Sequence, residues 1–138
     1  MASLALKTLL YVSKATFSPD TADAEIKKLC AMRKPQSEKS DVTGALIVSG
    51  DHLAEILEGS ASFIDSAAQT VHTHPHHAEV QIVRHAVITA RRFNGWEVVF
   101  SKPSEYVIGH IVEARASAGK LPKHPLRLEV FMQGMGRV

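Results

Sequence analysis

Short apolar runs separated by turn-forming residues divide the chain into segments of strand length. The pattern predicts five strands, over residues 5–13, 43–48, 52–58, 80–88 and 96–100. Only Ser49-Gly50-Asp51 separates the second strand from the third, and these residues favour a tight turn. The second and third strands are therefore expected to pair as an antiparallel hairpin.

Other apolar residues recur at intervals of three and four, which is the spacing of an amphipathic helix. A first helix, capped by Thr21 and ending near Pro35, places four residues on one face: Ile26, Leu29, Cys30 and Arg33. A second helix, capped by Ser60, has an apolar stripe made of Phe63, Ile64, Ala67, Ala68 and Val71. A third helix is predicted over 104–116, and a further apolar patch lies at 126–132.

The third predicted strand carries a carboxylate on its apolar face. Strict alternation puts Leu53, Glu55 and Leu57 on one side of the strand, and Ala54 and Ile56 on the other. Glu55 is then placed among core residues. A carboxylate among core residues calls for an explanation.

The order strand, helix, strand, strand, helix, strand, strand is typical of a ferredoxin-like α+β fold. Right-handed crossovers put both helices on one face of a mixed five-stranded sheet. The opposite face then has no helix from this set. The helix at 104–116 and the apolar patch at 126–132 form a C-terminal extension that is free to cover this face or to meet a partner subunit. We expect residues 1–102 to form the main domain and 103–138 the helix and tail.

Composition and charge exclude several classes of protein. The chain has 138 residues, 45% hydrophobic and 22% charged, which suits one globular domain. A net charge of +2, with scattered basic residues, argues against nucleic-acid binding. The longest apolar stretches fall far short of the roughly 20 residues of a membrane helix, and the amino terminus reads as a strand rather than a signal peptide. The single cysteine, Cys30, excludes an intrachain disulfide and favours a cytoplasmic location.

The ordered segments resemble the BLUF family, the flavin-based blue-light sensor domains of bacteria. The resemblance spans residues 4–101 and rests on these stretches: Leu9-Leu10-Tyr11-Val12-Ser13-Lys14-Ala15, Val42-Thr43-Gly44-Ala45-Leu46, Leu53-Ala54-Glu55-Ile56-Leu57-Glu58-Gly59, His77 with Val80, and Arg91-Arg92-Phe93-Asn94-Gly95-Trp96. It implies a ferredoxin-like fold that holds FAD between the two helices. It also implies a signalling role rather than an enzymatic one.

The resemblance assigns the two residues of the light-driven switch. In the family, a tyrosine on the first strand bonds a glutamine on the third strand, whose amide faces the flavin and rearranges after electron and proton transfer from the tyrosine. Tyr11 stands at the tyrosine position and Glu55 at the glutamine position. An ionised carboxylate only accepts hydrogen bonds, so Glu55 lacks the donor end of the amide. The family's photochemical switch is therefore expected to be missing.

Most other flavin-binding positions implied by the resemblance are also replaced. Gln36 and Ser37 stand for the paired asparagines that hold the flavin ring, and Thr70 stands for the arginine that meets the phosphates. The remaining positions are His74 for an aspartate, His76 for an arginine, Val98 for a methionine, and the retained Trp96. Because each charge-assisted hydrogen bond contributes roughly 1.5 to 3 kcal/mol, flavin binding is expected to be weak or absent.

A histidine cluster is the other chemical candidate. His72, His74, His76 and His77 include enough imidazoles for a metal, but Pro75 breaks the helical spacing and no acid or cysteine completes the set. We therefore predict a solvated loop and no metal site, with His77 at the family's structural histidine. No nucleophile, base and orienting group share a recognisable spacing either, so the chain is not expected to be an enzyme.

Two functions remain open. The first is a flavin-free interaction module that binds a protein partner or a second copy of itself through the exposed sheet face and the C-terminal segment. The alternative is a functional FAD-binding blue-light photoreceptor in spite of Glu55. Tyr11 is accordingly either a packed ring or a photoactive phenol, and Trp96 either a packing residue or a redox partner. Two interpretations of Glu55 also stay open: it is hydrogen-bonded to Tyr11 inside the fold, or it is solvated at a wet strand edge.

Overall fold

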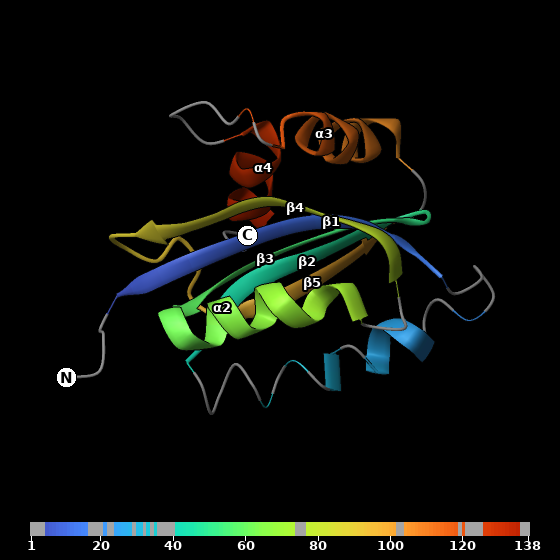
Figure 1. Ribbon diagram of the computed structural model, residues 1–138. Coiled ribbons are helices and arrows are strands. Elements are labelled where there is room, and N and C mark those ends of the chain that lie inside the picture. Colours follow the sequence, from blue (N-terminus) through green and yellow to red (C-terminus); the bar gives the residue numbers. More distant parts are fainter. Residues whose placement is uncertain are drawn as a thin grey trace.

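A five-stranded mixed sheet forms the centre of the molecule (Figure 1). The computed structural model describes residues 5–16, 21, 24–28, 30, 31, 33, 35, 41–73, 77–101, 104–118, 120 and 126–135. The strand order is β4-β1-β3-β2-β5. The strands are β1 (Leu6–Ala15), β2 (Thr43–Ser49), β3 (His52–Ser60), β4 (His77–Ile88) and β5 (Trp96–Ser101). Each predicted strand is confirmed, with ends that differ by up to three residues.

All neighbouring strands are antiparallel except β2 and β5, which are parallel. This is the mixed sheet that the ferredoxin-like topology predicts. The β2–β3 hairpin closes where Ser49 pairs with His52, which leaves Gly50 and Asp51 as the turn. Gly50 has φ of 60°, a left-handed conformation that glycine adopts without steric cost.

Helices begin where the sequence places capping hydroxyls. The Ser60 side chain accepts a hydrogen bond from the Phe63 amide at the start of α2 (Ala61–Thr70), which continues into η2 (Val71–Thr73). Ser104 accepts from the Val107 amide at the start of α3 (Glu105–Ala116). Residues 24–28, 30, 31, 33 and 35 are also helical and are called the first helical segment below.

The two faces of the sheet carry separate apolar cores. The first helical segment and α2 lie on one face, below the sheet in Figure 1. That core contains Leu9, Tyr11, Ile26, Val42, Leu46, Val48, Leu53, Leu57, Ile64, Val71 and Trp96. The alternation predicted for β3 is confirmed, because Leu53 and Leu57 belong to this core and Ala54 and Ile56 to the other.

Helices α3 and α4 (Arg127–Met135) lie on the opposite face (Figure 1). Val107 and Ile111 of α3, and Leu128 and Met132 of α4, are buried against the sheet there. The sequence predicts no secondary structure for the apolar patch at 126–132, and in the structure α4 begins within it, at Arg127. Among the described residues, no helix is long and apolar enough to span a membrane.

Candidate functional site

A buried carboxylate, Glu55, stands at the centre of a polar network between the sheet and the first helical segment. Its Oε1 accepts from the Tyr11 hydroxyl at 2.5 Å and from Arg33 Nη2 at 3.0 Å. Its Oε2 accepts from Arg33 Nε at 3.1 Å and from the Trp96 indole N–H at 2.8 Å. Glu55 is only 2% exposed, so the interpretation that it bonds Tyr11 inside the fold is confirmed and the solvated interpretation is wrong.

Backbone register brings these side chains together. Tyr11 in β1 is the direct cross-strand partner of Glu55 in β3, and side chains at paired positions point to the same face. Trp96 opens β5, and the parallel pairing of β5 with β2 places its ring in the same core. Arg33 reaches the carboxylate from the first helical segment, whose Ile26 is buried in that core.

The hydrogen-bond pattern fits an ionised Glu55. Arginine and indole N–H groups only donate, and between them they occupy both carboxylate oxygens. A proton on either oxygen would compete with one of these donors. The Arg33 side chain, 14% exposed, supplies the counter-charge through a two-point ion pair.

Burial and the charge of Glu55 both shift the pKa values of Tyr11 and Arg33. Burial raises the pKa of Tyr11 well above 10.0, and the adjacent Glu55 carboxylate raises it further because it disfavours a phenolate. Burial acts to lower the pKa of Arg33, but attraction to Glu55 outweighs it and raises that pKa overall. Tyr11 therefore stays a neutral donor and Arg33 a cation.

Arg33 was missed as a site residue by sequence reasoning. It was placed on the apolar face of the first helix, at the correct spacing from Ile26 and Cys30, but no role followed from that position. A cation on an apolar stripe, together with a carboxylate among the leucines of a strand, is a signal for a buried pair. The sequence alone offers no means of matching the two across 22 residues.

The other predicted flavin positions divide into three groups. Trp96 is 9% exposed, and its ring packs in the core while its N–H bonds Glu55. Val98 packs against the same core. Thr70 is exposed at the end of α2, where its hydroxyl donates to the carbonyls of Ser66 and Ala67 in its own helix. Four positions lie outside the described residues: Gln36, Ser37, His74 and His76.

The residues around Glu55 do not fit the flavin switch that the family resemblance implies. That switch needs a side chain with a donor end and an acceptor end next to the tyrosine. Glu55 offers only acceptor atoms, and each of them already has two donors from this chain. The neutral Thr70 hydroxyl also offers no positive charge for a phosphate. No step through a flavin follows from these residues.

Elsewhere, the described chain holds no group of three or more histidine, cysteine or acidic side chains that fits a metal ion. His72 is exposed, and residues 74–76 of the histidine cluster fall outside the described part. The prediction of no metal site therefore remains a prediction.

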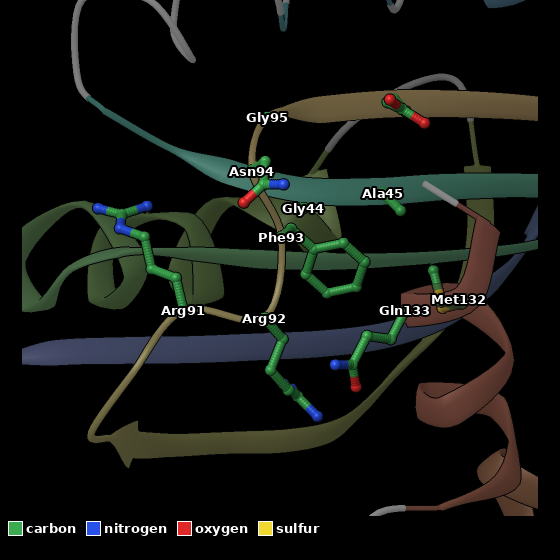
Figure 2. A pocket seen from close by; sticks show the side chains of 10 residues that line it. Gly44, Ala45, Arg91, Arg92, Phe93, Asn94, Gly95, Met132 and Gln133 are labelled. Carbon is green, nitrogen blue, oxygen red and sulfur yellow. The ribbon is translucent and has the colours of Figure 1, made fainter. Parts of the chain in front are cut away.

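A pocket of about 290 Å³ lies on the face of the sheet opposite Glu55, between the β4–β5 loop and the end of α4. Figure 2 shows the Phe93 ring in the middle of its lining, with Met132 and Gln133 coming from α4 and Gly44 and Ala45 from β2. This pocket shares no residue with the Glu55 network.

Comparisons with known proteins agree with the fold. The BLUF family model, described as sensors of blue-light using FAD, matches residues 6–99. No curated protein sequence matches the chain.

Solved structures of three proteins illustrate the likeness. BlsA in its ground state has a TM-score of 0.72 at 11% identity, over 96% of this chain and 89% of that one. BlrB, a BLUF protein in its dark state, has a TM-score of 0.60 at 23% identity, over 83% and 86%. A bacterial light-regulated adenylyl cyclase has a TM-score of 0.63 at 21% identity and covers 69% of this chain, which spans only 28% of the cyclase. These identities show the fold alone.

Proposed function

The chain belongs to the BLUF family, and from that premise we propose that it is a non-enzymatic signalling domain that has lost flavin photochemistry and acts through protein contacts. One observation carries this proposal: the carboxylate of Glu55, at the glutamine position of the family, is engaged by Tyr11, Arg33 and Trp96. A light-driven amide rearrangement has no amide to act on.

The charge balance supports weak or absent flavin binding. A flavin ring placed against Glu55 would put its carbonyl oxygens beside a carboxylate, and two acceptors without a donor between them repel each other. A ring that displaced Arg33 would break a buried ion pair, which costs about 3–5 kcal/mol. Since tenfold in affinity corresponds to about 1.4 kcal/mol, such a cost lowers flavin affinity at least a hundredfold.

Flavin binding by the whole protein tests the proposal. FAD, FMN and riboflavin are titrated into wild type and into the double variant Arg33→Gln/Glu55→Gln, with binding followed by quenching of flavin fluorescence. Wild type is expected to bind none of them at micromolar concentration. The matched control is Lys28→Gln, which breaks an ion pair near the surface of the same helical segment, where Lys28 Nζ lies 3.2 Å from Glu25 Oε1.

The result of the titration shows which replaced residues prevent flavin binding. Flavin uptake by the double variant alone would place the obstacle at Arg33 and Glu55, because this variant removes both charges and restores the amide at position 55. Uptake by neither protein would point also to the replaced positions such as Thr70. Micromolar binding by wild type, with a spectral shift under blue light, would contradict the proposal and favour the alternative of a working photoreceptor.

Exposed apolar side chains support the protein-contact part of the proposal. Tyr106 and Val112 on α3, Val130 on α4 and Val87 on β4 are each at least half exposed. Light scattering tests self-association, and the variant Tyr106→Ser/Val130→Ser is expected to lower any oligomer mass. Deleting residues 119–138 is not a clean test, because it would remove Leu128 and Met132 from the core.

A further inference from the structure

A second buried carboxylate, Glu129, ties α4 to the sheet on the face opposite Glu55. Glu129 is 1% exposed and accepts three hydrogen bonds from Arg84 of β4, at 2.8 to 3.1 Å. Its Oε1 also accepts from the backbone N–H of Leu126, at 3.0 Å, just before α4 begins. One side chain thus both caps the helix and holds it to the sheet.

Arg92 extends this network to the β4–β5 loop. Its Nη1 lies 3.2 Å from Glu129 Oε2, and its Nε lies 3.5 Å from Oε2 of Glu58, a fully buried residue of β3. Glu58 in turn accepts from the backbone N–H groups of Arg92 and Phe93, at 3.0 and 3.1 Å. Two buried carboxylates and two arginines therefore link β3, β4, the loop and α4.

The helix α4 is too short to be stable without contacts to the rest of the chain. It has nine residues, and an isolated helix of that length is not stable in water. Leu128 and Met132 bury its apolar side, while Val130 on the other side is 59% exposed. If Glu129 were neutral, the Leu126 N–H and the Arg84 guanidinium would lose their charged acceptor at the same time.

We propose that Glu129 is a latch: loss of its single negative charge undocks and unfolds α4, while the five-stranded sheet stays folded. The released state uncovers the apolar sheet residues under Leu128 and Met132 and removes one wall of the pocket at Phe93. This device does not involve the Glu55 network and does not depend on whether flavin binds.

Hydrogen exchange followed by mass spectrometry tests the latch on the full chain. In Glu129→Gln, backbone amides of residues 130–135 are expected to exchange about tenfold to a hundredfold faster than in wild type, because charge-assisted bonds are lost. Amides of β1 and β3 are expected to keep wild-type protection. Glu113→Gln, at an exposed position on α3, is the matched control and should leave α4 unchanged.

Two results would overturn the proposal. One is wild-type protection of α4 in Glu129→Gln, and the other is an equal loss of protection in α4, β1 and β3, which would indicate global destabilisation. If the variant does not fold, hydrogen exchange of the wild-type protein is measured at several low urea concentrations. The latch predicts that exchange rates of α4 amides rise less steeply with urea than those of β1 and β3, because α4 unfolds by itself and exposes less surface. The same urea dependence for all three elements would refute the proposal.

Discussion

Arg33 donates to both carboxylate oxygens of Glu55, from Nε at 3.1 Å and from Nη2 at 3.0 Å. The pair lies where the BLUF family implies a neutral amide, and it joins the first helical segment to β3. Trp96 and Tyr11 complete the set of donors, so each carboxylate oxygen accepts two hydrogen bonds from this chain. Tyr11, Arg33, Glu55 and Trp96 therefore satisfy one another's buried polar groups at this point of the fold.

The effects of Arg33 and Glu55 on stability should be strongly coupled. Arg33→Gln leaves Glu55 buried without its counter-charge and is expected to destabilise the fold by about 3–5 kcal/mol. Arg33→Gln/Glu55→Gln should cost less than the sum of the single variants, because no lone charge remains. Urea denaturation of the four proteins in the cycle measures this. Lys28→Gln, which breaks an exposed pair, should change stability by less than about 0.5 kcal/mol.

Tyr11 should make the fold sensitive to alkali. Its pKa in the folded state is well above 10.0, through burial and the Glu55 charge, and it returns to about 10.0 on unfolding. The protonated phenol is thus favoured by folding, so its contribution is complete below pH 10 and is lost as pH rises from 10 through the folded-state pKa. Tyr11→Phe should lack this loss of stability.

The chain's two tyrosines allow this to be measured directly. In Tyr106→Phe, the remaining phenol is Tyr11, and its phenolate absorbance should appear only well above pH 10, together with unfolding. Ionisation of Tyr11 near pH 10 in protein that still shows native circular dichroism would contradict the Glu55 network.

Glu129 should make the fold sensitive to acid. Burial acts to raise the pKa of Glu129, but hydrogen bonds from Arg84 and Leu126, and the charges of Arg84 and Arg92, lower it below 4.5 overall. Arg84 on β4 and Arg92 in the loop face it directly, and Glu58 on β3 faces it through Arg92. A lowered folded-state pKa gives stability that is present above pH 4.5 and is lost as pH falls through the folded-state value. Stability curves between pH 6 and 3 should fall less steeply for Glu129→Gln, and equal slopes would refute this assignment.

Glycine is required at one position and dispensable at another. At Gly44, where φ is 154°, a Cβ would collide with the carbonyl oxygen of Ile56 in the neighbouring strand. Gly44→Ala is therefore expected to destabilise the fold by about 2–5 kcal/mol. At Gly109 in α3 a Cβ meets nothing, so Gly109→Ala should stabilise by about 0.5–1 kcal/mol. Thermal melts compare the two variants, and similar melting temperatures would show that β2 and β3 leave room for a Cβ at position 44.

Local patterns predicted most of the fold. Alternation along β3 placed Glu55 among leucines, the Ser60 hydroxyl marked the start of α2, and the spacing of apolar residues predicted α3. Such signals depend on neighbours within a few residues, which a sequence displays directly. The 126–132 patch was ambiguous because α4 is short and is stabilised by residues far away in the chain.

The polar partners could not be read from the sequence for the same reason. Glu55 bonds Arg33 across 22 residues, and Glu129 bonds Arg84 across 45. Which cation meets which carboxylate depends on strand order and helix placement, and only folding sets these. The family resemblance implied the ferredoxin-like fold and the Tyr11 position, but it gave no cation to pair with a carboxylate at position 55.

Whether the Arg33–Glu55 pair excludes flavin is tested most directly by the absorption spectrum of the whole protein. The spectrum is recorded after incubation with excess FAD and desalting, in darkness and after blue light. The Arg33–Glu55 pair predicts a colourless protein with no flavin bands and no difference between the two spectra. Retained flavin whose absorption shifts to longer wavelength after illumination would contradict the account, because it would mean that the site opens and that Glu55 performs the task of the amide.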